Sequence, residues 1–142
     1  MKNKFAELTA FIPKMKDDAF GEWVVDSVND GTPEHPKQFP FVNYSSVVDG
    51  FIDTLYKYCK AHPEYEHTRY GDTLNSLGLE WDSTSMEQAD VSNIDAKGVI
   101  ALLMGAVRAE RFCDGALLSF LKSGCILRWL ERLAEIDNLA EE

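Results

Sequence analysis

Residues 98–115, GVIALLMGAVRAERFCDG, decide the fold that we expect. The uncharged first part of this stretch is too short to span a bilayer and is typical of a buried helix. Ser92, Asn93 or Asp95 caps that helix, which runs to about Glu110. Ionisable side chains and a thiol follow where the chain bends towards the next helix. This polar segment is therefore either a contact that holds packed helices together or the rim of a functional site.

Two further helices complete the C-terminal third of the chain. Asp114 is a natural cap for the first, and Lys122-Ser123-Gly124 has the basic last turn and the glycine of a helix end. The last helix begins at Cys125 and runs to about Asp137. Because the connections are very short, these helices must pack as neighbours. We expect the centre of the core to be formed by Ile100, Leu103, Val107, Leu117, Leu121, Ile126, Leu130 and Leu133.

The N-terminal half predicts helices on either side of a small β element. Apolar residues at helical spacing indicate a helix over residues 3–12. Pro13 either interrupts it or begins the next turn of helix. Two segments rich in β-formers, separated by a turn-rich stretch, predict a small hairpin between residues 21 and 44. Ser45 or Ser46 then caps a helix that ends near Lys60.

The middle of the chain gives the weakest pattern. Residues 64–92 mix glycine, asparagine, aspartate, serine and threonine with scattered apolar positions, so we expect a less ordered segment. Its anchors to the core are Leu74, Leu77, Leu79 and Trp81.

Length and composition fit one domain. A chain of 142 residues with 45% hydrophobic and 11% aromatic residues can bury a core of useful size. We therefore expect a mainly α fold over residues 1–142, a compact single-domain bundle of five or six helices centred on residues 93–137. The small β element near residues 21–44 is its other component.

Charge and cysteine content exclude several classes of function. The formal net charge of −10 at pH 7 argues against general nucleic-acid binding and against anionic membrane surfaces. The N-terminus lacks the long apolar run that a signal peptide requires. Three cysteines are an odd and sparse set, typical of reduced thiols in the cytosol. We therefore expect a cytoplasmic protein that binds neither nucleic acid nor a membrane.

Several of these segments resemble a known family. They are Phe11-Ile12-Pro13, Gly21-Glu22-Trp23, Phe39–Val42 leading into Tyr44-Ser45, Ala106–Gly115, Ser123-Gly124 and Arg128–Leu133. Together they are similar to the bacterial family catalogued as domain of unknown function 6508, and the segment Arg-Phe-Cys-Asp-Gly is fairly specific to that family. The resemblance covers most of the chain and is weak over residues 64–84. It implies a small bacterial protein and supplies no activity, cofactor or catalytic residue.

The candidate site lies in the polar segment and comprises Arg108, Glu110, Arg111, Cys113 and Asp114. The two arginines could form a fork for a carboxylate or phosphate, or they could bind helix carbonyls and neighbouring acids, which we favour. The thiol could be a nucleophile if the arginines and the next helix activated it, but no motif ties a histidine base to it. A buried structural thiol is the favoured reading for Cys113 and for Cys125.

Other candidate constellations carry less weight. Cys59 and His62, followed by His67, mimic part of a zinc pattern without a convincing fourth ligand, so we expect no metal and no cofactor. Five acids between Glu80 and Asp95 form either a solvated face or a docking surface for a basic protein. Aromatic residues that could line a ligand pocket, or simply cover the core, are Trp23, Phe39, Phe41, Tyr44 and Trp81.

No phosphate-binding glycine loop, nucleophile elbow or dinucleotide fingerprint occurs in the sequence. We therefore expect a small acidic protein of bacteria that acts by interaction or regulation rather than catalysis. Its candidate partners are a second copy of the chain, through an apolar helix face, and a basic protein. The alternative is a domain or small enzyme that binds a small anion through Arg108 and Arg111.

Overall fold

The computed structural model describes residues 4–25, 30–36, 41–65 and 69–140. It is mainly helical with a two-stranded antiparallel sheet, which confirms the predicted fold class. The strands are β1 (Gly21–Val24) and β2 (Phe41–Tyr44). The helices are α1 (Ala6–Thr9), α2 (Phe11–Lys16), α3 (Ser46–Ala61), α4 (Tyr70–Ser76), α5 (Ser83–Glu87), the short 3₁₀ helix η1 (Val91–Asn93), α6 (Ala96–Ala109), α7 (Ala116–Lys122) and α8 (Cys125–Ala140).

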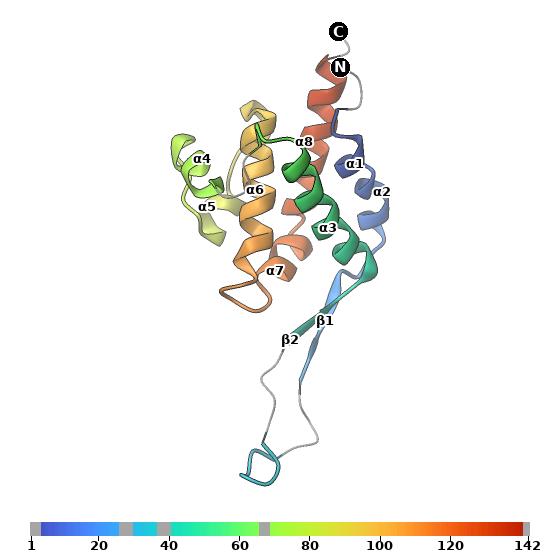
Figure 1. Ribbon diagram of the computed structural model, residues 1–142, viewed down its shortest axis with the longest axis vertical. Helices are drawn as coiled ribbons and strands as arrows, with labels where there is room; N and C mark the ends of the chain where they lie inside the picture. Colours follow the sequence, from blue (N-terminus) through green and yellow to red (C-terminus); the bar gives the residue numbers. More distant parts are fainter. Residues whose placement is uncertain (1–3, 26–29, 37–40, 66–68, 141–142) are drawn as a thin grey trace.

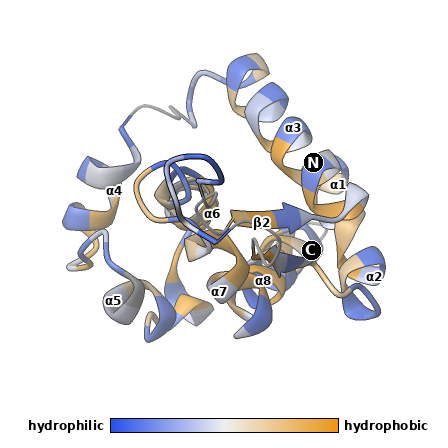
Figure 2. Ribbon diagram, turned by 90° about the horizontal axis from the view of Figure 1, so that it is seen from below, coloured by the Kyte–Doolittle hydropathy of each residue, from blue (hydrophilic) through white to orange (hydrophobic). Residues whose placement is uncertain are grey.

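Helix α6 forms the centre of the molecule. Every residue from Gly98 to Val107 is buried, as the absence of charge in this stretch predicts. Helices α4, α7 and α8 pack against α6, and α4 and α3 lie on opposite sides of it (Figures 1 and 2). The predicted core is confirmed, because one buried cluster contains Ile100, Leu103, Val107, Leu117, Leu121, Ile126, Leu130 and Leu133.

Helix α8 joins the two ends of the chain. It packs against α6 and α7 on one side and against α1 and α2 on another. The indole of Trp129 is fully buried in this contact region. Near the end of α8 the buried carboxylate of Asp137 accepts a hydrogen bond from the backbone N–H of Phe5, at 3.1 Å. The N-terminal helices are thus part of the same core as the C-terminal third.

The middle of the chain contributes more helix than the sequence pattern indicates. Helices α4 and α5 lie within residues 64–92 and η1 begins there, so the expected number of five or six helices is too low. Aspartates supply part of the local order: the side chains of Asp82, Asp90 and Asp95 accept hydrogen bonds from backbone N–H groups at the starts of α5, η1 and α6. These three members of the acidic run are helix caps. The cap at Asp95 is one of the predicted alternatives.

Pro13 does not interrupt the N-terminal helical region. It lies in the first turn of α2, where a proline is tolerated because its missing N–H has no helical acceptor. The break falls instead at Ala10, between α1 and α2. The predicted interruption at Pro13 is therefore wrong, and the alternative, in which the proline begins a next turn of helix, fits the structure. Residue 3 of the predicted helix lies outside the described residues.

The two strands form a hairpin that projects from the helical body (Figure 1). Their register pairs Gly21 with Tyr44 at the base and Val24 with Phe41 farther out. A bridge between Thr32 and His35 closes the turn at its far end. We call residues 21–25, 30–36 and 41–44 the hairpin arm. Strand residues predicted at positions 39 and 40 lie outside the described part of the chain.

The base of the hairpin arm is tied to α3 through Ser45. Its hydroxyl accepts the backbone N–H of Val48 at 3.2 Å, which makes it the cap of α3 and decides between the two predicted serines. The same hydroxyl donates to the carboxylate of Asp18 at 2.6 Å, and that carboxylate also accepts the N–H of Phe20 at 3.0 Å. The segments that enter and leave the hairpin arm are therefore held together.

The cysteines differ in accessibility. Cys59 and Cys125 are buried, but Cys113 is exposed. The expectation of a buried thiol is confirmed for Cys125 and wrong for Cys113, because the turn after α6 leads the chain out of the core before α7 begins. Burial also raises the pKa of the Cys59 thiol to about 11.

We expect one thiol per chain to react with a disulfide reagent in the native protein, and all three in denaturant. Cys113 is exposed, whereas burial removes Cys59 and Cys125 from the reagent, and the raised pKa of Cys59 keeps that thiol protonated. Spectrophotometric thiol titration of the parent and of Cys113→Ser checks this. Rapid titration of any thiol in native Cys113→Ser would contradict the assignment.

Candidate functional site

The carboxylate of Glu110 organises the connection between α6 and α7. It accepts a hydrogen bond from the phenol of Tyr44 at 2.6 Å. It also accepts the backbone N–H of Gly115 at 3.0 Å and that of Leu117 at 3.1 Å. The phenolic oxygen of Tyr44 in turn accepts the N–H of Leu118 at 3.0 Å. One carboxylate thus joins the end of β2, the end of α6 and the start of α7.

This arrangement caps α7 with side chains from elsewhere in the chain. The cap position is Gly115, which adopts a left-handed φ of 87° and has no side chain to offer an acceptor. Glu110 and Tyr44 supply the missing acceptors, and a negative charge is favourable at a helix N-terminus. Asp114 was the predicted cap; it is exposed, and the prediction is wrong because the helix begins one residue later than it requires.

The second contact at this connection is between Trp23 and Gly115. The indole of Trp23 lies so close that a Cβ on Gly115 would come within 2.9 Å of the indole Cη2 atom. The positive φ and this close approach both require glycine at position 115. The hairpin arm therefore contacts the α6–α7 connection through one residue of each strand, Trp23 of β1 and Tyr44 of β2.

The phenol of Tyr44 is held in its protonated form. Burial raises its pKa above the ordinary value, and the hydrogen bond to Glu110 and the negative charge of Glu110 raise it further. The N–H of Leu118 acts in the opposite direction but does not outweigh these effects. Tyr44 is therefore a stable hydrogen-bond donor to Glu110, and nothing in its surroundings equips it to act as a base near neutral pH.

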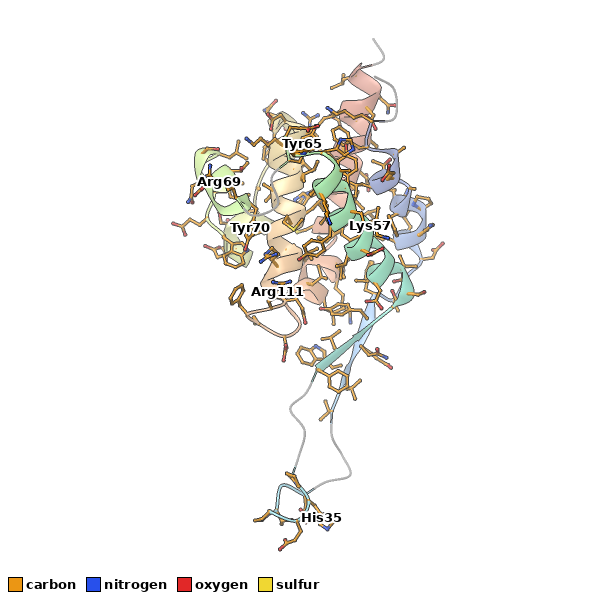
Figure 3. The ribbon with its side chains drawn as sticks, in the orientation of Figure 1. His35, Lys57, Tyr65, Arg69, Tyr70 and Arg111 are labelled. Atoms are coloured by element: carbon orange, nitrogen blue, oxygen red, sulfur yellow. The ribbon has the colours of Figure 1, made fainter. Side chains whose placement is uncertain are left out.

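The two candidate arginines have different surroundings. The guanidinium of Arg108 stacks over the ring of Tyr70, 5.9 Å from the ring centroid, and its buried Nε atom has no hydrogen-bond acceptor within the described part of the chain. Arg111 is exposed at the turn that follows α6, and Figure 3 labels it and Tyr70. The guanidinium of Arg108 is thus engaged with α4.

Cys113 lies at a hollow of about 290 Å³ beside the same connection. Trp81 and Phe112 form one wall, with their rings edge to face and their centroids 5.5 Å apart. The ring of Phe112 is 75% exposed. We call this hollow the aromatic pocket; its lining residues are Trp81, Asp82, Met86, Ala109, Phe112, Cys113, Ala116 and Phe120.

The aromatic residues that the sequence singled out belong to two different places. Trp81 lines the aromatic pocket, whereas Trp23, Phe41 and Tyr44 belong to the hairpin arm. Phe39 lies outside the described residues. Sequence reasoning missed Phe112 as a pocket residue, because a phenylalanine in a polar turn carries no periodic signal.

The histidines that the structure describes are not part of the lining around the thiol of Cys113. His35 is exposed in the far turn of the hairpin arm, and the ring of His62 stacks on Tyr58 with centroids 4.2 Å apart. His67 falls outside the described residues. Among the side chains that the structure places, no group of three or more His, Cys, Asp or Glu residues is arranged to hold a metal ion.

Comparison with known proteins identifies the family. The model of a family of unknown function, DUF6508, matches residues 1–138, and the chain belongs to this family. No curated protein and no solved structure matches the chain. Of the helices in the described ranges, none combines the length and apolar character that crossing a bilayer demands.

We expect Glu110→Ala to lower the free energy of unfolding by about 2–3 kcal/mol, since hydrogen bonds to a charged group contribute more than neutral ones and partly buried donors lose their acceptor. The matched control is Arg111→Ala, because Arg111 is an exposed residue of the same turn. This substitution should change the free energy of unfolding by less than about 0.5 kcal/mol. Urea denaturation measures both. Equal effects of the two substitutions would show that Glu110 has no special structural role.

We expect Tyr44→Phe to flatten the alkaline pH dependence of stability. Above pH of about 10 the phenol of the unfolded chain ionises, whereas the raised pKa keeps the folded phenol protonated, so stability falls as pH rises. Removing this group should reduce the slope between pH 10 and 11, by less than the roughly 1.4 kcal/mol per pH unit that one fully titrating group gives, because solvent screens a partly exposed phenol. Denaturation curves over pH 8–11 test this, and parallel profiles for parent and variant would refute it.

Proposed function

We propose that this chain is a small acidic, non-catalytic interaction protein of the bacterial cytoplasm and that the hairpin arm is its contact surface. The observation that carries the proposal is the exposure of apolar side chains on the arm. Trp23 is 48% exposed, Val25 63% and Phe41 45%, and Val24 is exposed as well. Scattered single apolar residues are normal on a surface, but a group of them marks a contact site.

The form of the arm supports the same conclusion. A two-stranded hairpin by itself is marginally stable in water, and both of its strands leave an edge of unpaired backbone groups. A partner strand added to one edge would pair the open backbone groups and, by covering the apolar side chains, stabilise the hairpin. The projection of the arm from the helical body makes it accessible to such a partner (Figure 1).

Contacts with the helical body hold the base of the arm in one position before any partner binds. Tyr44 is bonded to Glu110 and Leu118, and Trp23 packs on Gly115, so both strands start from fixed positions. Fixing a binding element in advance reduces the conformational entropy that association would otherwise cost. The polar segment 108–115 then serves the function indirectly, as the support of the arm.

Charge favours a basic partner over a second copy of the chain. The formal net charge is −10, and Glu22, Asp30 and Glu34 place carboxylates on the arm itself. Two such surfaces repel each other, whereas a basic surface is attracted, most strongly at low salt. A homodimer remains the second partner that the apolar side chains support. Nucleic acid is disfavoured because phosphate contacts need clustered cations.

The alternative is a domain that binds a small anion through Arg108 and Arg111. One observation favours it, the buried Nε of Arg108 that has no acceptor in the described structure. Against it, the guanidinium of Arg108 already stacks on Tyr70, and Arg111 is exposed in the turn that follows. Stacking uses the face of the guanidinium, so an anion would have to bind to the in-plane N–H groups of Arg108. The interaction proposal rests on several exposed apolar side chains rather than on one arginine.

A photo-crosslinking residue at position 25 tests the proposal. In the native cell the arm should give a discrete crosslinked product with a basic protein, and the same residue at Lys57, exposed on α3, should not. With that partner purified, Phe41→Ser should weaken binding about tenfold, because truncating an interface aromatic typically costs more than 1 kcal/mol. Leu139→Ser, an exposed residue of α8, is the matched control. Identical products at positions 25 and 57 would refute the proposal.

A further inference from the structure

The aromatic pocket has a rigid floor and one exposed wall. Its floor includes Met86 and Phe120, which are almost completely buried. Trp81 is fixed by a hydrogen bond from its indole N–H to the backbone carbonyl of Gly105, at 2.9 Å, and by an edge-on contact with Tyr70. Phe112 completes the wall from the exposed turn. The hollow is therefore a feature of the packed core, opened to solvent on one side.

The volume of the aromatic pocket limits the size of the ligand that it can bind. About 290 Å³ is at the lower end of small-molecule sites, and an apolar cavity of about 150 Å³ is enough for a benzene ring. A fused two-ring system therefore fits. Edge-to-face and offset contacts with the rings of Trp81 and Phe112 favour a planar aromatic group over an aliphatic one.

The charge around the aromatic pocket limits the chemical class of the ligand further. Asp82 is the one ionisable carboxylate in the lining, and neither arginine nor lysine lines the pocket. Asp82 is exposed and lies at the start of α5, where one of its oxygens caps the helix. The net charge of −10 adds a long-range preference for cations. An aromatic carboxylate is disfavoured by both effects, and an aromatic ring that carries an alkylammonium group is favoured by both.

We propose that the aromatic pocket between α5, the end of α6 and the start of α7 is a binding site for an arylalkylammonium ion, that is, a planar aromatic ring that carries a protonated alkylamine. The ring lies against Trp81 and Phe112, and the ammonium group faces Asp82. The site is separate from the contact surface of the proposed function. Ala116 lines the pocket, whereas its neighbour Gly115 contacts Trp23 of the hairpin arm, and no residue of the arm lines the pocket. Either proposal can fail without the other.

Cys113 provides a built-in reporter for this site. Its thiol lines the pocket, and it is the exposed one of the three cysteines in the chain. Occupation of the pocket shields the thiol from a small neutral reagent such as iodoacetamide. Cys59 and Cys125 are buried and do not contribute to the rapid reaction.

The experiment compares three probes that share one ring system: tryptamine, indole and indole-3-acetate. Tryptamine should slow alkylation of Cys113 saturably, by about tenfold when its concentration is ten times its Kd, since only unoccupied protein reacts. Indole should bind more weakly, and indole-3-acetate most weakly. The absence of saturable protection by tryptamine would overturn the proposal. Protection by indole-3-acetate equal to that by tryptamine would overturn the assigned role of Asp82.

Variants locate the bound probe. Ala116→Leu fills the pocket and Phe112→Ala removes its exposed wall, so each should abolish or strongly reduce protection by tryptamine. Leu139→Ala, far along α8, is the control and should behave as the parent. A second readout, the NMR shift of the Trp81 indole N–H on adding tryptamine, should persist in Cys113→Ser. Protection that is unchanged in both Ala116→Leu and Phe112→Ala would place the probe elsewhere and refute the proposal.

Discussion

The carboxylate of Glu110 accepts hydrogen bonds from three donors, the phenol of Tyr44 and the backbone N–H groups of Gly115 and Leu117. Helix α7 is short and starts at a glycine, so it has no cap of its own. The hairpin arm is likewise a two-stranded element that could not hold its position alone. Helix α7 and the hairpin arm therefore both depend on the carboxylate of Glu110. This residue lies at the end of α6, where these two elements, neither of which is stable alone, meet.

The two proposed surfaces share this connection as their support. On one side Trp23 and Tyr44 fix the base of the hairpin arm. On the other side Phe112, Cys113 and Ala116 line the aromatic pocket. The turn between α6 and α7 thus separates a surface suited to a macromolecule from a hollow suited to a small molecule. A shift of this turn would alter both surfaces, because their residues are adjacent in the chain.

The acidic residues are not one functional patch. Asp82, Asp90 and Asp95 cap helices in the middle of the chain, which explains why a segment poor in apolar residues still forms α5 and η1. Glu110 caps α7, and the carboxylate of Asp18 holds the base of the hairpin arm. Part of the strong negative charge therefore serves helix and hairpin geometry, and the remainder sets the preference for cationic partners.

The sequence by itself determined the mainly α fold, the burial of α6 and the residues of the central core. These follow from local patterns: an uncharged run from Gly98 to Val107 and an apolar stripe at helical spacing in α8 report burial directly. It also located the hairpin and narrowed the cap of α3 to Ser45 or Ser46, because turn residues and caps act over a few positions. The family likeness seen in the polar segment is confirmed over residues 1–138.

Only the tertiary structure decided what the polar segment does. Tyr44 and Glu110 are 66 residues apart, and no local pattern records a hydrogen bond between them. The same holds for Trp23 against Gly115, for Arg108 over Tyr70 and for Trp81 beside Phe112. The exposure of Cys113 depends on the direction in which a turn leaves the core, which composition does not encode. Long-range packing fixes these contacts, because it brings together side chains whose separation along the chain leaves no periodic trace.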